Sequence, residues 1–171
     1  MHSIRAARDD EHDKLAAEMA RLFLSAYSHA STPQNLQAYI ESAFRPEVQA
    51  QELRDPRLET LIVEDGSGWA GFAQLGLEAP PPIACAARTP GVVQRFYLDP
   101  RAHGRGLAQA LMDTLKQRAR ARGADLLWLG VWQEAPRAIR FYEKTGFRIA
   151  GTVTFMIGPD PKLDWMMTCE L

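Results

Sequence analysis

The hydrophobic pattern of the second half of the chain changes its period several times. Residues 92–98, "VVQRFYL", are rich in β-branched and aromatic side chains, which is typical of a strand. From Leu107 to Ala119 the apolar residues recur at three- and four-residue steps, and Gly123 follows, which predicts an amphipathic helix and its end. The continuous apolar run "DLLWLGVW", residues 125–132, then favours a central strand that is buried on both faces.

A second helix pattern follows that central strand. Pro136 suits a first helical position, Tyr142 falls on the apolar face, and Gly146 is placed to end the helix. Residues 147–158 and 163–171 are patterned as two further strands, which close the chain.

The first half of the chain begins with a strand and two helices. Residues 3–8 are patterned as a short strand, and Asp9 or Asp10 is suited to cap the helix that follows. Thr32 suits the N-cap of a second helix, and Pro33 suits its first position. The apolar faces of these helices hold Leu15, Met19, Leu22, Phe23 and Ala26 in the first, and Leu36, Tyr39, Ile40 and Ala43 in the second.

The remaining segments complete a mixed pattern. A short third helix is expected around residues 48–53. Residues 59–65 and 69–78 are strand-like and flank the turn "DGSG", which is a strong hairpin signal. The predicted order is β-α-α-α-β-β-β-α-β-α-β-β, which places the chain in the α/β (α+β) class.

Composition and charge narrow the class of protein. The 171 residues suit one domain that spans 1–171, and 46% hydrophobic with 24% charged residues is ordinary for a globular protein. Twenty basic and twenty-one acidic residues give a net charge of −1, so we expect neither a nucleic acid nor a membrane as partner. The N-terminus lacks the apolar core of a signal peptide, which favours the cytoplasm.

The spacing of cysteine and histidine gives no metal signal. Cys85 and Cys169 lie far apart in the chain, and we expect both to be reduced. His2, His12 and His29 lack the spacing of a metal site, so no metal is expected.

The junction between the strand at 92–98 and the helix after it carries the strongest chemical signal. No acidic residue occurs from position 100 to position 107, and Gly104 and Gly106 stand at the start of the helix. Glycine removes the Cβ atoms that would keep a ligand away from the free N–H groups there. These donors and the positive end of the helix dipole suit a phosphate, although a glycine-rich loop before an ordinary helix fits the same residues. The side chains that would reinforce such a site are Arg101, His103 and Arg105.

Two segments resemble the signatures of one known family. "RAHGRGLA", residues 101–108, is similar to the R/Q-x-x-G-x-G/A coenzyme A signature of the GNAT superfamily of N-acetyltransferases, and "RAIRFYEKTGF", residues 137–147, resembles its second signature helix. Their order and separation fit, and the likeness covers almost the whole chain. It implies a mixed, mostly antiparallel sheet of about seven strands, with flanking helices and a splayed parallel pair that holds coenzyme A.

The resemblance implies which residues would bind acetyl-CoA. The backbone of residues 96–98 would pair with the pantetheine amides, and the N–H groups from His103 to Ala108 would receive the pyrophosphate. The full set expected at the cosubstrate is Phe96, Tyr97, Leu98, Arg101, His103, Gly104, Arg105, Gly106, Leu107, Ala108, Ala135 and Tyr142.

The resemblance also implies the reaction. In this family an amine attacks acetyl-CoA directly in a ternary complex, so neither a cysteine nor a serine is expected as nucleophile. Tyr142 matches the family's tyrosine near the coenzyme sulfur, where a phenol would protonate the departing thiolate as general acid. Its helical periodicity by itself also fits an ordinary core aromatic.

Two positions depart from the family pattern. Val92 stands where many relatives have a glutamate base, and Ala135 stands where they have an asparagine that contacts coenzyme A. Deprotonation of the amine is therefore left open between help from another side chain through water and loss of the proton to solvent. With both residues changed, an acyl-CoA-binding sensor or interaction domain without transferase activity is the alternative to an enzyme. The side chains considered for the base are Glu134, Glu64 and Gln94.

The acceptor amine is predicted only as a class. The chain is similar to a subgroup that includes bacterial spermidine/spermine N-acetyltransferases, so a polyamine or another small amine is the first expectation, and amino acids and peptide N-termini are alternatives. The last hairpin offers edge strands, and fold analogy leaves a homodimer open. The carboxylates in segments that border the family's acceptor site are Glu41, Glu47, Glu52, Asp160 and Asp164.

Overall fold

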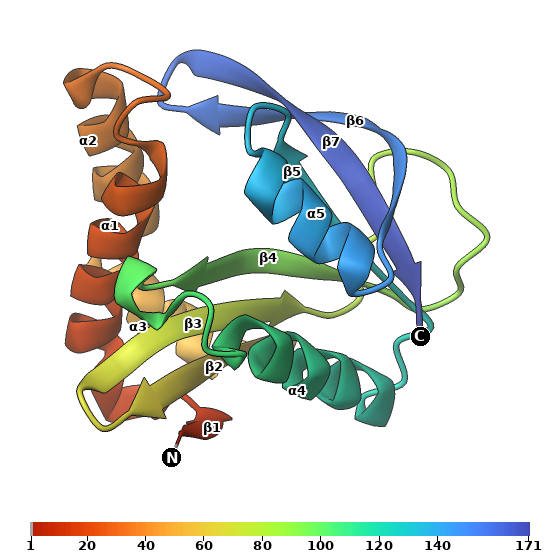
Figure 1. The fold of residues 1–171 in the computed structure, drawn as a ribbon, viewed down its shortest axis with the longest axis horizontal. Coiled ribbons are helices and arrows are strands. Elements are labelled where there is room, and N and C mark those ends of the chain that lie inside the picture. The colour runs from red at the N-terminus through yellow and green to blue at the C-terminus, as the bar shows by residue number, and fades with distance from the viewer. Residues whose placement is uncertain (1) are drawn as a thin grey trace.

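A seven-stranded sheet forms the centre of the computed structural model, which describes residues 2–171 (Figure 1). Its strand order is β1-β2-β3-β4-β5-β7-β6, and every neighbouring pair is antiparallel except β4 and β5, which are parallel. The strands are β1 (Ser3–Ala6), β2 (Leu58–Asp65), β3 (Gly68–Gly76), β4 (Pro90–Leu98), β5 (Leu126–Trp132), β6 (Arg148–Ile157) and β7 (Asp160–Glu170).

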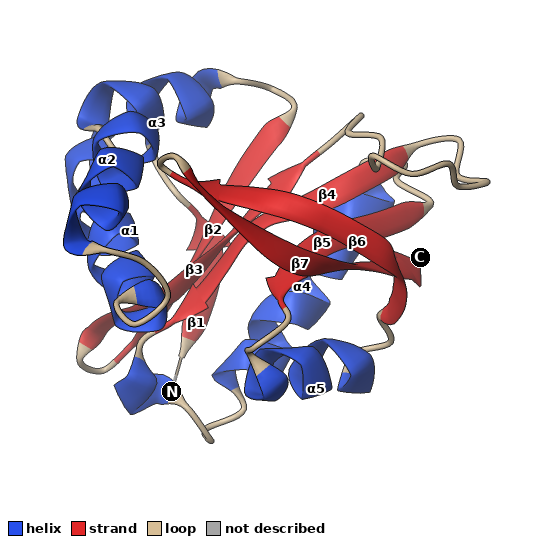
Figure 2. Cartoon of the chain, turned by 90° about the horizontal axis from the view of Figure 1, so that it is seen from above, coloured by secondary structure: helices blue, strands red, loops and turns tan. Residues whose placement is uncertain are grey.

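Five α-helices cover the two faces of this sheet (Figure 2). Three of them pack on one face around Phe23 and Phe72, and the other two pack on the opposite face around Leu111 and Phe147. Each helix buries its apolar stripe, which is the largest favourable contribution to such packing. The first three are α1 (His12–Tyr27), α2 (Pro33–Ala43) and α3 (Pro46–Arg54), and the other two are α4 (Leu107–Ala121) and α5 (Pro136–Lys144).

The predicted order of strands and α-helices is confirmed, and the differences lie at element ends. Asp9 and Asp10 were expected to cap α1, but they form a short 3-10 helix with Glu11, and α1 begins at His12. The Glu11 carboxylate accepts a hydrogen bond from the Arg8 N–H at 2.9 Å, which favours the 3-10 turn over a capped helix start. The first strand ends at Ala6 rather than residue 8 for the same reason.

Other local predictions can be compared directly with the structure. Thr32 caps α2 as predicted, because its hydroxyl accepts from the Asn35 N–H at 3.3 Å. Cys85 and Cys169 are free thiols, as expected, the first exposed and the second buried. Within residues 2–171, no helix has both the length and the apolar composition to cross a membrane.

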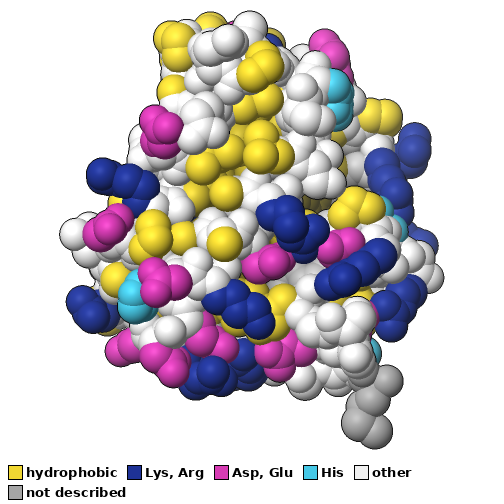
Figure 3. Space-filling model, turned by 90° about the vertical axis from the view of Figure 1, so that its left-hand side faces the viewer, with side chains coloured by type: hydrophobic (Ala, Val, Ile, Leu, Met, Phe, Trp, Pro, Cys, Tyr) yellow, Lys and Arg dark blue, Asp and Glu magenta, His cyan; other side chains and the backbone are white. Residues whose placement is uncertain are grey.

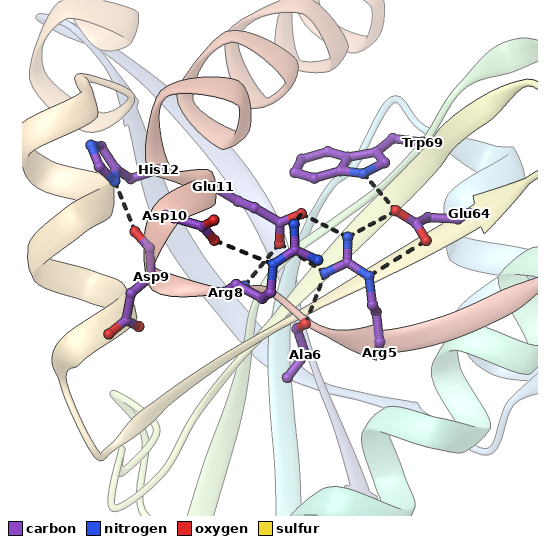
Figure 4. A network of polar contacts seen from close by, with 9 residues as sticks. All are labelled: Arg5, Ala6, Arg8, Asp9, Asp10, Glu11, His12, Glu64 and Trp69. Carbon is purple, nitrogen blue, oxygen red and sulfur yellow. Dashed lines mark hydrogen bonds and ion pairs between the residues drawn. The ribbon is translucent and has the colours of Figure 1, made fainter.

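A network of ion pairs and hydrogen bonds connects β1 with β2, β3 and the segment before α1 (Figure 4). The Arg5 guanidinium donates to Glu11 at 2.7 and 2.8 Å and to Glu64 at 2.8 Å, and the Trp69 indole N–H donates to Glu64 at 2.8 Å. The hydrogen bond from Arg5 lowers the pKa of Glu11 to about 2, and it also lowers the pKa of Glu64. The network therefore fixes the short edge strand β1, which has only β2 as a neighbour.

Replacing Arg5 with Ala should lower stability in a pH-dependent way. The pKa of folded Glu11, about 2, lies below its ordinary 4.5, so the network stabilises the fold above about pH 4.5 and loses this effect as the pH falls toward 2. We expect Arg5→Ala to lower the free energy of unfolding by about 1–2 kcal/mol at neutral pH. Urea unfolding at neutral and acid pH measures this, with Arg57→Ala as control, because Arg57 forms an exposed pair with Asp55 outside this network. An equal loss at both pH values would contradict the assignment.

The parallel pair β4 and β5 separates shortly after it begins. The two strands pair only between residues 90–92 and 126–128, although β4 continues to Leu98 and β5 to Trp132. The far side of β4 remains paired with β3 as far as Leu98. The sheet therefore opens between β4 and β5, with α5 following β5 and α4 following β4 along the chain (Figure 1).

Candidate active site

The opening between β4 and β5 exposes strand backbone that has no strand partner. Beyond Val92, β4 pairs with β3 but not with β5, so one side of its backbone is free along residues 96–98. The side chains alternate in direction: Phe96 packs against the cluster under α4 and α5, whereas Tyr97 packs against the cluster under α1. Free strand groups of this kind suit an extended ligand that carries amides.

The two glycines form the turn that leads into α4. Gly104 and Gly106 adopt φ angles of +76° and +77°, which side chains rarely tolerate, and no atom lies within 4 Å of the Cβ that either would carry. The backbone conformation therefore requires glycine here, and the space beside it is open. α4 has no side-chain cap, and its first helical hydrogen bond runs from the Ala110 N–H to the Gly106 carbonyl. The N–H groups of the first turn are thus available to an anion.

The two arginines of this turn make contacts inside the protein. Arg105 contacts Asp65 at 2.5 Å, and Arg101 donates to the Trp69 carbonyl at 3.0 Å and lies 3.5 Å from Asp99. Both side chains are about half exposed, at 51%. Sequence reasoning missed these partners, since Asp65 and Trp69 lie in the β2–β3 hairpin. Positive charge at the turn is therefore partly neutralised, and the backbone donors remain the main feature.

His103 and Ala135 lie at the two helix starts. Partial burial and the charge of Arg137 lower the pKa of His103, so the imidazole is neutral at pH 7 and adds no positive charge to the turn. Ala135 is the N-cap of α5, where it offers no side-chain cap, and its N–H donates to the Trp132 carbonyl at 3.0 Å.

Tyr142 extends from α5 into the cluster beside the opening. It is 9% exposed, and its ring lies 6.2 Å from that of Phe96 and 5.9 Å from that of Phe147. Burial raises the pKa of Tyr142 well above its ordinary value, with a smaller contribution from Tyr27, and no hydrogen bond offsets this shift. Tyr142 therefore stays a neutral phenol throughout the neutral pH range, able to donate a proton.

Tyr27 joins the opening to Asp164, a buried carboxylate that the sequence offered only as one of five near the acceptor. Its ring lies 6.5 Å from that of Tyr97, which is in the opening, and 6.3 Å from that of Trp132. Burial raises its pKa to about 12, and the negative charge of Asp164 adds to the shift. Asp164 is 5% exposed, its Oδ1 atom has no hydrogen-bond partner in the described part of the chain, and burial raises its pKa to about 7. The sequence signal for it was only that of one carboxylate among five.

The side chains considered as bases lie elsewhere. Glu64 is held by Arg5 and Trp69, and the hydrogen bond from Arg5 lowers its pKa, which makes it a poor proton acceptor. Glu134 and Gln94 are exposed. Val92 is half-buried, and its Cγ1 atom lies only 2.8 Å from where a Cβ at Gly76 would stand, so it packs tightly against β3.

The other carboxylates expected near the acceptor are paired or exposed. Glu52 is bound by Arg95 at 2.5 and 3.1 Å, and Asp160 accepts from Ser31 at 2.5 Å and pairs with Lys162 at 2.9 Å. Glu41 and Glu47 are exposed on α2 and α3. No group of three or more potential metal ligands comes together within residues 2–171.

Comparison with known proteins identifies relatives of this arrangement. The model of the acetyltransferase (GNAT) family matches residues 16–147. An uncharacterized N-acetyltransferase of Mycobacterium tuberculosis is 35% identical over 159 residues, which is 93% of this chain and 97% of the relative. The mycothiol acetyltransferase of Beutenbergia cavernae is 36% identical over 132 residues, 77% of this chain and 41% of that protein.

A solved structure has the same fold. The PaiA N-acetyltransferase of Thermoplasma acidophilum, in complex with coenzyme A, superimposes with a TM-score of 0.80 over 100% of this chain and 99% of that chain. Its sequence identity is 17%, so this likeness concerns the fold.

Proposed function

The chain belongs to the GNAT acetyltransferase family, and from this membership we propose that it transfers acetyl from acetyl-CoA to a primary amine by direct attack in a ternary complex. The observation that carries the proposal is the opening between β4 and β5, which has free strand backbone on one side, the glycine turn at one end and Tyr142 beside it. The comparisons give no support to a sensor without transferase activity.

Binding of acetyl-CoA would rest mainly on backbone groups. The N–H groups from His103 to Ala108 would receive the pyrophosphate, because the turn is open and its helix start is uncapped. The free edge of residues 96–98 would pair with the pantetheine amides. Ala135 can offer only backbone and a methyl group at its position.

Tyr142 would act as the general acid. Its neutral phenol lies in a dry aromatic cluster, and the thiolate that leaves the thioester needs a proton. Strand N–H groups of residues 96–98 would polarise the acetyl carbonyl.

The acceptor is proposed as a small primary amine. A polyamine is the expectation from the resemblance, but it would need several free carboxylates, and Glu52 and Asp160 are already paired with cations. The proposed location is the cytoplasm. A homodimer through edge strand β6 also stays a proposal, for which the exposed Ile149 and Met156 on that strand are suitable.

The test of the proposed function is release of thiol from acetyl-CoA. The acceptors are spermidine, spermine, aryl and alkyl monoamines, amino acids and short peptides, with product mass measured for each. Release with one acceptor class, together with an acetylated product, is the expected result. Binding of acetyl-CoA in calorimetry without release for any acceptor would overturn transfer and favour the sensor.

Replacing Gly106 with Ala should weaken acetyl-CoA binding. A side chain at φ +77° is strained by about 1–2 kcal/mol, so the turn would relax and tilt its N–H groups away from the ligand. We expect the Kd for acetyl-CoA to rise about tenfold, because a loss of about 1.4 kcal/mol of binding free energy corresponds to a tenfold change in Kd. Calorimetry measures it, with Gly123→Ala as control, because Gly123 has a similar φ of +84° at the other end of α4. Equal affinity in wild type and Gly106→Ala would contradict the assignment.

A further inference from the structure

We propose that Asp164 is the carboxylate that binds the acceptor's ammonium group and takes its proton, and that the acceptor is a monoamine with an apolar or aromatic body. This inference rests on the proposed acetyltransferase function and names the general base and acceptor class of that same site.

The position of Asp164 follows from strand register. Asp164 on β7 is paired with Trp132 on β5 and Val153 on β6, and paired residues of antiparallel strands extend to the same face of the sheet. A Cβ at Gly130 would lie 3.2 Å from the Asp164 Oδ2 atom and 3.3 Å from Val153. The absence of a side chain at position 130 therefore leaves room for this carboxylate.

The surroundings of Asp164 are aromatic. Tyr27 brings its ring to 6.3 Å from Trp132 and 6.1 Å from Phe155, and His29 lies 5.5 Å from Trp132. On the side of the molecule that Figure 3 shows, hydrophobic side chains form a band along the upper part, and most of the charged side chains lie below it. Aromatic rings beside a carboxylate are the arrangement that binds organic ammonium groups.

Asp164 takes part in none of the ion pairs formed within residues 2–171. Its Oδ1 atom is buried without a hydrogen bond. On its own strand, Lys162 is held by Asp160, and on β4 the guanidinium of Arg95 is held by Glu52. The titratable group that its charge acts on is Tyr27 from α1. Two others lie one ring further away: His29 is 5.5 Å from the ring of Trp132, and Tyr97 from β4 is 6.5 Å from the ring of Tyr27. A buried acceptor atom left without a partner is costly, and a ligand that donates to it removes this cost.

Tyr27 connects Asp164 to the reacting end of the site. The charge of Asp164 adds to the burial that raises the pKa of Tyr27, and Tyr27 adds to the burial that raises the pKa of Tyr142. The ring contacts give the geometry: the Tyr27 ring lies 6.3 Å from that of Trp132, which is the register partner of Asp164, and 6.5 Å from that of Tyr97 on β4. The neighbouring Phe96 ring of β4 lies 6.2 Å from that of Tyr142. Trp132 packs with the cluster under α1, so an ammonium at Asp164 would lie on that face of the sheet, opposite to α4 and the glycine turn that leads into it.

The acceptor class follows from which carboxylates are buried without a cation. A polyamine carries several ammonium groups, but Asp160 and Glu52 are already paired with Lys162 and Arg95. Glu41 and Glu47 are exposed on α2 and α3, so Asp164 is the carboxylate of the five that is both buried and unpaired. One buried carboxylate among aromatic rings suits one ammonium on an apolar body.

The proton transfers balance. One proton passes from the R–NH₃⁺ group to the Asp164 carboxylate, which frees the nitrogen lone pair. A carbon–nitrogen bond then forms at the acetyl carbon, the carbon–sulfur bond breaks, and its electron pair leaves on sulfur. Tyr142 protonates the thiolate, the nitrogen's second proton restores Tyr142, and Asp164 releases its proton to water. The sum is one amide, one thiol and one proton.

The first test is the pH profile of kcat/KM in wild type, Asp164→Asn and Asp160→Asn. A base whose pKa is about 7 should make wild-type kcat/KM rise about tenfold per pH unit below that value and level off above it. We expect Asp164→Asn to lose about 10²-fold at about pH 8 and to rise without a plateau toward the amine's own pKa. Asp160→Asn, which changes the same charge on the same strand, should keep the wild-type profile. A wild-type profile in Asp164→Asn would overturn the proposal.

The second test measures binding without turnover. The probes are 2-phenylethylamine and the neutral 2-phenylethanol, titrated by calorimetry into the protein saturated with coenzyme A. We expect the amine to bind at least tenfold more tightly than the alcohol in wild type and equally in Asp164→Asn. Equal affinity of the two probes in wild type would overturn the role of Asp164, and spermidine binding more tightly than both would overturn the monoamine class.

Folding is checked in the same samples. The pKa of folded Asp164 is raised from 3.8 to about 7, so its ionisation destabilises the fold increasingly as the pH rises between these values. Asp164→Asn should therefore unfold at a temperature no lower than wild type at about pH 8. The binding test needs no transfer, so loss of the proposed function, seen as no thiol release by wild type, is distinguishable from failure of the role of Asp164.

Discussion

Replacing Tyr142 with Phe should lower kcat about 10³-fold while changing the Kd of acetyl-CoA less than about threefold. The phenol is a neutral proton donor beside the opening, and its ring is packed among Phe96 and Phe147. Phenylalanine preserves this packing and removes only the hydroxyl. The thiolate would then leave without a proton, so the loss should fall on the chemical step. Steady-state kinetics at saturating acetyl-CoA, with calorimetry for binding, measures the two quantities.

A matched control separates catalysis from the loss of a buried hydroxyl. Thr60→Val removes a buried hydroxyl from β2, where it accepts from the Gln74 side chain at 3.2 Å. It should leave kcat within about twofold of wild type. Unchanged kcat in Tyr142→Phe, with chemistry shown to limit the rate by a burst experiment, would make Tyr142 a core aromatic.

Replacing Arg95 with Leu should cost about 3–5 kcal/mol of stability. Arg95 extends from β4 and donates to Glu52 of α3 at 2.5 and 3.1 Å and to Gln74 of β3 at 2.8 Å. Its side chain is 9% exposed, and Gln74 is fully buried. The substitution would leave the Glu52 carboxylate and the Gln74 carbonyl without this partner in a mostly dry site. Urea unfolding at neutral pH measures the loss.

The double variant Arg95→Leu/Glu52→Leu tests the cause of that loss. It removes both charges, so it should be more stable than Arg95→Leu alone, as is typical when a buried pair is replaced by apolar side chains. Arg57→Leu, which breaks an exposed pair with Asp55, should change stability little. A double variant less stable than Arg95→Leu would show that packing of α3, and not the lone carboxylate, determines the loss.

The sequence predicted the elements well where the pattern is local. Apolar residues that recur every second position indicated strands, and those that recur every three to four positions indicated helices, which predicted the order of the elements. Thr32 was also identified correctly as a helix cap. The start of α1 was wrong because the Glu11 carboxylate binds the Arg8 N–H, a competition that helix periodicity does not reveal. Such errors concern a few residues at an element's end.

In the candidate site, too, the sequence predicted the features that depend on neighbouring residues and missed those that depend on distant ones. The glycine turn could be predicted, because positive φ angles and an uncapped helix start leave a pattern of residue types in the chain. The partners of Arg105 and Arg101 could not, since they come from a distant hairpin. Asp164 was one of five similar carboxylates until burial and register distinguished it.

The sequence by itself determined the elements of this protein, its family resemblance and the turn before α4, because each depends on residues close together in the chain. Only the tertiary structure decided which charges are paired, which carboxylate is dry and which aromatic rings surround it. Burial and ion pairing depend on which residues the fold brings together, and not on their order in the chain. Asp160 pairs with Lys162, whereas Asp164, four residues later on the same strand, is the register partner of Trp132 and acts on Tyr27.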